Sequence, residues 1–197
     1  MERIYLAIVL APLAGALVAG LFGRAIGRTA SHVVTIAGVA VAAALSLLVL
    51  KDQWWDGADP YNGSVYTWAV VEGVRMEVGF LVDRLTALMM VVVTSVSLMV
   101  HVYTIGYMHD DPGYQRFFSY ISLFTFAMLM LVMANNFLQL FFGWEAVGLV
   151  SYLLIGFWYT RPTAIFANLK AFLVNRVGDF GFLLGIAVLL MYTGSLD

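Results

Sequence analysis

Six long apolar runs, separated by short polar breaks, dominate the pattern of hydrophobic and polar positions along this chain. Each run holds about 18 residues or more, and a helix of that length, rising 1.5 Å per residue, crosses a hydrocarbon core about 30 Å thick. The last run is long enough to tilt or to contain an irregular turn. The pattern therefore predicts six membrane-spanning helices, over about residues 4–23, 33–50, 85–108, 117–134, 138–158 and 165–191.

Residues 51–82 form the longest polar interruption and separate the second predicted helix from the third. The first part of this segment, through Gly63, is rich in Asp, Gly, Pro and Asn, which favour turns. The second part is rich in Val, Tyr, Trp and Phe, and Glu72-Gly73 is a candidate bend for a short hairpin. We therefore expect an extramembrane loop holding a short β-hairpin, followed by a helix that Asp83 caps at its N-terminus.

The composition agrees with a chain whose solvent is lipid. It is 62% apolar and 11% charged, whereas soluble domains are roughly 45–50% apolar and about 25% charged. We therefore expect an all-α integral membrane protein. The absence of cysteine excludes disulfides and Cys-ligated zinc or iron–sulfur sites, and the absence of a basic tract argues against nucleic-acid binding.

Basic residues in the short loops predict the orientation in the membrane, because the positive-inside rule is most reliable there. One side of the six-helix arrangement carries its cations in short loops, and the other carries them at the chain terminus and around the acidic 51–82 loop. The first group is therefore assigned to the cytoplasm, and both chain ends and the 51–82 loop to the periplasm. The cytoplasmic group is Arg24, Arg28, Arg116 and Arg161. The periplasmic group is Arg3, Lys51, Arg75 and Arg84.

Four ionisable residues lie within the last two apolar runs: Glu145, Lys170, Arg176 and Asp179. A charge at the bilayer centre costs about 2.5–3.5 kcal/mol on insertion scales, so such residues are functional candidates. Arg176 and Asp179 are three residues apart and share a helix face, whereas Lys170 falls on roughly the opposite face. The structural alternatives are a hydrogen-bonded Glu145, a self-neutralising Arg176–Asp179 pair, and a Lys170 that extends to the membrane interface.

The chemistry suited to these residues is proton transfer, since a carboxylate takes up or releases a proton as a cation leaves or approaches. The residues do not favour redox or nucleotide chemistry, because the sequence lacks a dinucleotide-binding glycine fingerprint, a Walker loop and the paired histidines of haem-binding helices. We therefore expect no cofactor in this chain. His101 is interpreted as a packing or interfacial histidine, with a proton carrier as the alternative.

Several motifs, in this order and spacing, resemble one family. They are residues 113–118 (GYQRFF), 135–137 (NNF), 143–157 (GWEAVGLVSYLLIGF) and 170–179 (KAFLVNRVGD). The chain is similar over essentially its whole length to the antiporter-like subunit L of bacterial respiratory NADH:quinone oxidoreductase (complex I), the equivalent of mitochondrial subunit five.

The resemblance implies a core of fourteen helices in two inverted five-helix repeats. It implies that residues 1–112 are an N-terminal three-helix segment with a periplasmic loop, and that residues 113–197 begin the first proton-translocating repeat. Glu145 would be the fifth-helix glutamate that pairs with a lysine on helix seven, and Lys170, Arg176 and Asp179 would be the polar residues of helix six. Because the sequence ends before helix seven, we expect a truncated chain or a fragment in which Glu145 lacks its partner and is protonated.

The resemblance also implies a function. The subunit would be non-redox and would contribute to proton translocation coupled to NADH oxidation and quinone reduction, while flavin and iron–sulfur clusters would lie in partner subunits. Its partners would be other complex I membrane subunits, especially a neighbouring antiporter-like subunit, and its location the bacterial inner membrane. The alternatives are a subunit of a multi-subunit Na⁺/H⁺ antiporter and a non-transporting structural fragment.

Overall fold

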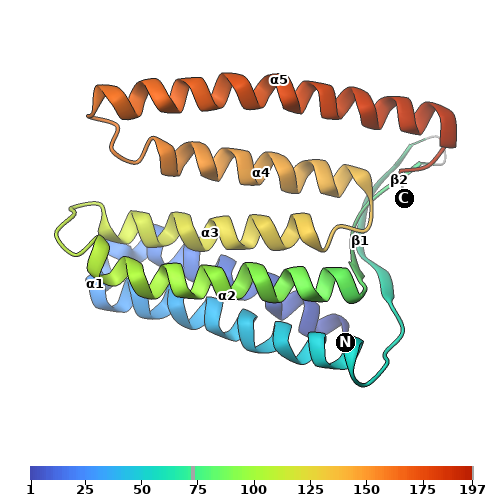
Figure 1. Cartoon of the computed structure of the whole chain (residues 1–197), viewed down its shortest axis with the longest axis horizontal. Helices are drawn as coiled ribbons and strands as arrows, with labels where there is room; N and C mark the ends of the chain where they lie inside the picture. Colours follow the sequence, from blue (N-terminus) through green and yellow to red (C-terminus); the bar gives the residue numbers. More distant parts are fainter. Residues whose placement is uncertain (72–73, 197) are drawn as a thin grey trace.

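The computed structural model describes residues 1–71 and 74–196. Over these residues the chain forms long helices and an antiparallel hairpin that extends from one end of the helical bundle (Figure 1). All five helices are long and apolar enough to cross a membrane, so the predicted all-α membrane fold with a small β element is confirmed. The elements are α1 Glu2–Trp54, β1 Tyr61–Val71, β2 Val74–Val82, α2 Arg84–Tyr107, α3 Tyr114–Val132, α4 Phe137–Ile155 and α5 Pro162–Thr193.

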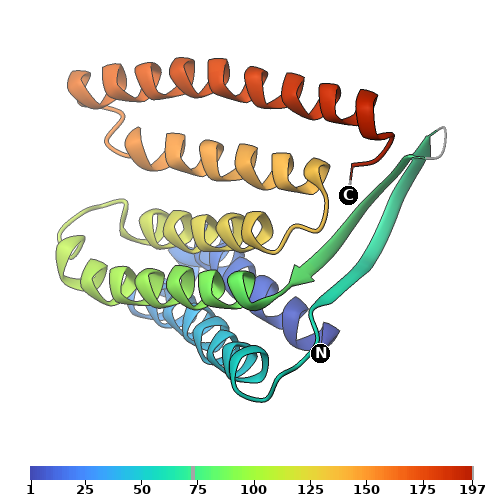
Figure 2. The same ribbon diagram turned by 45° about the vertical axis from the view of Figure 1, so that its right-hand side comes forward.

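The first helix consists of two antiparallel halves that meet at Gly27, where φ is 79° and ψ is 179°. Glycine adopts a positive φ without the steric cost that a Cβ imposes. The halves lie side by side (Figures 1 and 2), and a Cβ added at Gly38 would lie only 2.6 Å from the Ala11 carbonyl oxygen. Together with α2–α5, the two halves account for the six predicted spans. The polar break predicted between the first two spans, 4–23 and 33–50, is instead helical on both sides of Gly27.

The helices form successive layers (Figures 1 and 2): α1, α2 and α3 form one group, α4 packs on α3, and α5 packs on α4. Ser119 and Ser122 of α3 donate hydrogen bonds to carbonyl oxygens of α1, at 2.7 Å to Ala16 and 2.8 Å to Pro12. The outer helix α5 is much more open, since Asp179 and Ile186 are its only buried residues. The main apolar cluster lies between α1, α2, α3 and the base of β2, with Tyr5, Ile8, Phe80, Met90, Leu129 and Met133 among its buried members.

The hairpin is longer than predicted. Its strands pair antiparallel from Tyr61↔Val82 towards their far ends, so residues 62 and 63, predicted to form a turn, lie in β1. Pairing with β2 overrides the turn preference of these two residues. The base of the hairpin is also held to the helical bundle, because Leu81 N–H donates to the Met133 carbonyl oxygen at 3.0 Å. The predicted bend at residues 72–73 lies outside the described residues.

Asp83 caps α2 as predicted, because its side-chain oxygen accepts a hydrogen bond from Thr86 N–H at 2.7 Å. We expect Asp83→Ala to lower the free energy of unfolding by about 1 kcal/mol, the usual cost of a lost N-cap. Asp83→Asn keeps a side-chain acceptor and should lower the free energy of unfolding much less. Thermal unfolding of the complete purified protein measures both, with Asp59→Ala in the neighbouring loop as control. Equal loss in the Asn and Ala variants would contradict the capping role.

Candidate functional site

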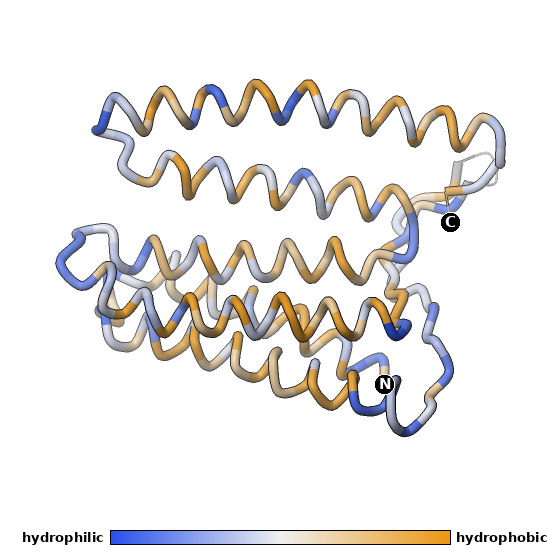
Figure 3. The backbone as a smooth tube through the Cα atoms, in the orientation of Figure 1, coloured by the Kyte–Doolittle hydropathy of each residue, from blue (hydrophilic) through white to orange (hydrophobic). Residues whose placement is uncertain are grey.

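The charged side chains predicted to form a site come from the last two helices of the chain, α4 and α5. Asn136 starts α4, since its side-chain oxygen accepts a hydrogen bond from Gln139 N–H at 2.8 Å. Pro162 lies in the first turn of α5, where its missing N–H would have no helical partner. The two helices run antiparallel, and hydrophilic turns interrupt their apolar course near the middle (Figure 3).

Arg176 of α5 joins two carboxylates. One of its terminal nitrogens, Nη1, forms an ion pair with Oε2 of Glu145 on α4 and a second with Oδ2 of Asp179, one helical turn further along α5, at 3.4 Å. The Arg176 guanidinium also lies over the Phe172 ring, with 4.9 Å from Cζ to the ring centroid. One cation therefore serves two acids, and the three side chains together carry one negative charge when all are ionised.

A tryptophan completes this cluster. The indole N–H of Trp144 donates to Oδ1 of Asp179 at 2.8 Å. Trp144 and Glu145 are neighbours in α4, so the Trp144–Asp179 and Glu145–Arg176 contacts link the same two helices twice. We call Trp144, Glu145, Arg176 and Asp179 the ion-pair ring.

The ion-pair ring is shielded unequally from its surroundings. The side chain of Asp179 is 10% exposed, that of Glu145 23% and that of Arg176 40%. Both oxygens of Asp179 are engaged, whereas Oε1 of Glu145 makes no hydrogen bond with any residue that the structure describes. The ring therefore leaves one carboxylate oxygen open to accept a proton.

Lys170 does not join the ion-pair ring, although it was predicted as part of the same network. Its side chain is exposed and pairs with no acid among residues 1–71 and 74–196. The reason is helical geometry: Arg176 and Asp179 share one face of α5, and Lys170 lies on roughly the opposite face. Three of the four predicted site residues thus meet and the fourth stands apart.

The structure corrects one expectation about Glu145, namely that it has no cationic partner in this chain. Its expected partner was a lysine on helix seven, but Arg176 of α5 forms an ion pair with it instead. The sequence analysis placed an Arg176–Asp179 pair beside Glu145 and did not predict that the same arginine contacts both acids. The predicted protonation of Glu145 stays a prediction.

The sequence reasoning missed Trp144. The available signal was its position beside Glu145 within an apolar span, where an indole N–H finds an acceptor only in another side chain or backbone group. His101, by contrast, lies away from the ion-pair ring. It is fully buried between α2 and α3, its Nδ1 lies 2.8 Å from the Ser97 carbonyl oxygen, and its ring lies beside Phe118. Its other ring nitrogen, Nε2, is buried and has no hydrogen-bond partner among the described residues, so the interpretation as a packing histidine stays a prediction.

Two family models match the chain. The model described as "NADH-Ubiquinone oxidoreductase (complex I), chain 5 N-terminus" matches residues 68–118. The model described as "NADH:quinone oxidoreductase/Mrp antiporter, TM" matches residues 134–197. The two matches together include more than half of the chain.

Curated relatives match over almost the whole chain. NADH-quinone oxidoreductase subunit L of Neisseria meningitidis serogroup A is 68% identical over 193 residues, covering 98% of this chain and 29% of that protein. NADH-ubiquinone oxidoreductase chain 5 of Rhizopus stolonifer is 45% identical over 193 residues, again covering 98% of this chain and 29% of the relative. The chain thus spans less than a third of the length of these relatives.

A solved structure has the same fold at low sequence similarity. A chain of the membrane-bound sulfane sulfur reductase, an archaeal respiratory membrane complex, superposes with a TM-score of 0.84 at 16% identity. The superposition covers 99% of this chain and 38% of that one. The helix order and the packing of α4 and α5 described above therefore belong to a fold that also occurs in this archaeal protein.

Proposed function

Because this chain belongs to the family of NADH:quinone oxidoreductase subunit L and chain 5, we propose that it forms part of a membrane subunit that moves protons without redox chemistry of its own. The observation that carries the proposal is the ion-pair ring, in which one arginine is shared by two carboxylates inside membrane-length helices. Ionisable residues within membrane-spanning helices are rare and mark ion and proton pathways.

The ion-pair ring suggests how its residues would handle a proton. A shielded carboxylate binds a proton when its cation withdraws and releases it when the cation returns. Arg176 contacts Glu145 and Asp179 with the same nitrogen, so a small rotation of its side chain changes which acid it neutralises. Asp179 also accepts the hydrogen bond from Trp144, whereas Oε1 of Glu145 has no hydrogen-bond partner among the described residues, so we assign the exchanged proton to Glu145.

We further propose the setting of this part of the protein. NADH oxidation, quinone reduction and the flavin and iron–sulfur cofactors would belong to other subunits, and a neighbouring antiporter-like subunit would be a direct partner. Residues 1–112 would form an N-terminal segment and residues 113–197 the start of a proton-translocating repeat. The membrane would be the bacterial inner membrane, with the N-terminus and the hairpin in the periplasm, which the short arginine-bearing loops support.

A second candidate function is cation/proton exchange within a multi-subunit Na⁺/H⁺ antiporter. The description of the family model over residues 134–197, which includes Mrp antiporters, favours keeping it. The two candidates differ in their energy source. Proton movement driven by NADH oxidation and indifferent to a sodium gradient would support the complex I role, whereas movement driven by sodium alone would support the antiporter.

The direct test is Glu145→Gln in the complete protein within its complex, reconstituted into vesicles. Proton movement during NADH oxidation, followed with a pH-sensitive dye, is expected to fall several-fold, because glutamine has a similar shape but cannot exchange a proton. Glu2→Gln, an acid at the chain end, is the matched control and should behave as the unmodified protein. Unchanged proton movement per NADH oxidised in Glu145→Gln would refute the proposed role.

A further inference from the structure

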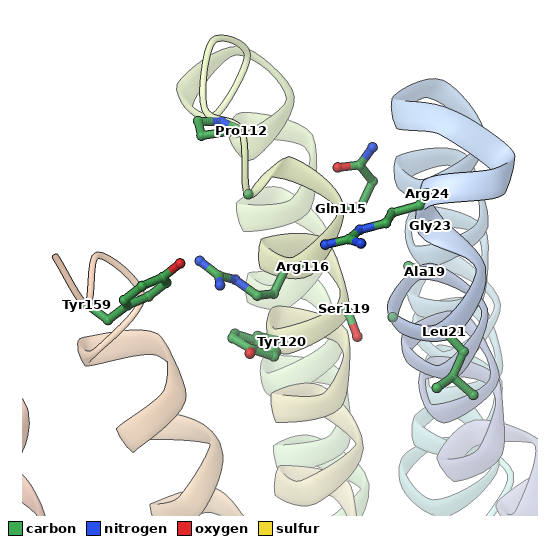
Figure 4. Close-up of a pocket in the computed structure, with 12 residues that line it drawn as sticks. Ala19, Leu21, Gly23, Arg24, Pro112, Gln115, Arg116, Ser119, Tyr120 and Tyr159 are labelled. Atoms are coloured by element: carbon green, nitrogen blue, oxygen red, sulfur yellow. The ribbon is translucent and has the colours of Figure 1, made fainter.

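A second polar feature lies outside the ion-pair ring, at the end of the bundle where α3 begins and α4 ends. It is a cavity of about 690 Å³ between α1, the start of α3 and the connection after α4 (Figure 4). This volume falls within the range of about 300–1,000 Å³ typical of small-molecule sites. The residues that give it its character are Arg24, Arg116, Gln115, Leu21, Tyr120 and Tyr159.

Two guanidinium groups line this cavity from different helices. Arg24 reaches from α1 towards α3, and it makes neither a hydrogen bond nor an ion pair with any residue in the described part of the chain (Figure 4). Arg116 of α3 points towards Tyr159 and donates one hydrogen bond, from Nη2 to the Phe157 carbonyl oxygen at 3.1 Å. Its Nε is buried and has no partner among the described residues. The cavity thus holds cationic donors that the chain itself does not satisfy.

The nearby acids do not neutralise these arginines. The Asp111 carboxylate is occupied on both oxygens, by Gly113 N–H at 2.7 Å and by the Trp158 indole N–H at 2.9 Å. Asp110 lies 2.8 Å from the His109 ring nitrogen. Neither acid forms an ion pair with Arg24 or Arg116 within the described residues. The Arg116 guanidinium also lies over the Phe157 and Tyr159 rings, at 4.5 and 5.4 Å from Cζ to the ring centroids. An anion entering the cavity would therefore meet two guanidinium groups that form no ion pair with any described residue.

The backbone adds to this positive potential. α3 begins at Tyr114 beside the cavity, and no side chain caps its first turn. Tyr114 N–H donates to the Asp111 carbonyl oxygen at 3.3 Å, and the remaining N–H groups of the first turn and the positive end of the helix dipole favour an anion at this position. Two arginines and an uncapped helix start thus converge on one cavity.

Several features favour a lipid as the source of the anion. The cavity lies at the ends of membrane-length helices, and Leu21, which lines it, is 73% exposed and so offers an apolar surface next to the charged one. Tyr120 and Tyr159 supply the amphipathic rings common at membrane interfaces. Arg24 and Arg116 also belong to the arginines assigned to the cytoplasmic side, where the leaflet carries anionic lipids.

We propose that this cavity binds the phosphate of an anionic phospholipid, held by Arg24 and Arg116, with the acyl chains lying against Leu21. Guanidinium groups suit this ligand because their N–H groups match two phosphate oxygens at once. Such a lipid would fasten the start of α3 to α1 and to the connection after α4. The proposal is independent of proton transfer at the ion-pair ring, since it uses none of the same residues.

The test compares phosphatidylglycerol with phosphatidylcholine on the complete purified protein, by native mass spectrometry during lipid titration. The unmodified protein is expected to bind phosphatidylglycerol more tightly than phosphatidylcholine. The double variant Arg24→Gln/Arg116→Gln is expected to lower the affinity for phosphatidylglycerol by about tenfold or more, because two charge-assisted contacts are lost. Arg161→Gln is the matched control: it removes a charge from the same end, where Arg161 lies over the Trp158 ring and outside the cavity.

A second variant shows whether lower lipid binding has a cause other than misfolding. Gln115→Glu keeps the side-chain shape and places a negative charge in the cavity, so it should lower the affinity for phosphatidylglycerol and leave the affinity for phosphatidylcholine unchanged. Equal lipid binding by the unmodified protein and both cavity variants would overturn the proposal. So would displacement of the lipid by millimolar inorganic phosphate, which would make a soluble anion the ligand.

Discussion

Arg176→Gln is expected to have the largest effect of any single substitution in α5. It leaves Glu145 and Asp179 without a cation at once, and both carboxylates are more shielded than Arg176 itself, with side chains 23% and 10% exposed. Two shielded carboxylates left side by side without a cation repel each other and destabilise the packing of α4 on α5. The midpoint of thermal unfolding of the complete protein should fall, and proton movement in reconstituted vesicles should be nearly lost.

A double variant separates charge from shape. Arg176→Gln/Glu145→Gln no longer contains the unpaired Glu145 carboxylate, so it should recover part of the stability lost in Arg176→Gln while still failing to move protons. Lys170→Gln is the matched control, since it removes a cation of the same helix that has no acidic partner in the described part of the chain. If the double variant is no more stable than Arg176→Gln, or if Lys170→Gln is as damaging, the ion-pair ring is not the source of the effect.

Gly143→Ala is expected to be the most damaging small change in packing, because α3 and α4 touch at this glycine. A Cβ at Gly143 would lie 2.7 Å from Cα and 2.9 Å from the backbone nitrogen of Leu131, and backbone atoms cannot move aside as a flexible side chain can. Overpacking of this kind costs about 1–3 kcal/mol, which exceeds the helix-propensity gain of about 1 kcal/mol from replacing glycine by alanine. Thermal unfolding should therefore show a net loss of stability.

The same substitution one and a half turns along α4 is its control. A Cβ at Gly148 would meet nothing within 4 Å, so Gly148→Ala should be neutral or slightly stabilising. Gly143→Ala should also reduce proton movement, because Glu145 lies two residues away and shifts with α4. Equal stability of the two alanine variants would show that α3 and α4 adapt their spacing freely.

The candidate site was partly predictable because its parts follow local rules. The three-residue spacing of Arg176 and Asp179 places them on one helix face and predicted their pairing, and the position of Glu145 within an apolar run identified it as a candidate. The contact between Glu145 and Arg176 was not predictable in this way, because it depends on the rotation of α4 against α5. The role of Trp144 depends on the same rotation. Lys170 was included because it is an ionisable residue of the same apolar run and of the motif that carries the resemblance.

The sequence by itself determined that lipid is the solvent, how many helices cross it, and that acids and cations occupy its last two spans. These properties depend on the length and polarity of single segments, and each segment expresses them whatever its neighbours are. Only the tertiary structure decided the length and anchorage of the hairpin, the helical joint at Gly27, and which of the charged residues meet. These features depend on contacts between distant segments, such as Leu81 with Met133 and Gly143 with Leu131. The ion-pair ring is of this second kind, because the packing of α4 against α5 determines which carboxylates Arg176 contacts.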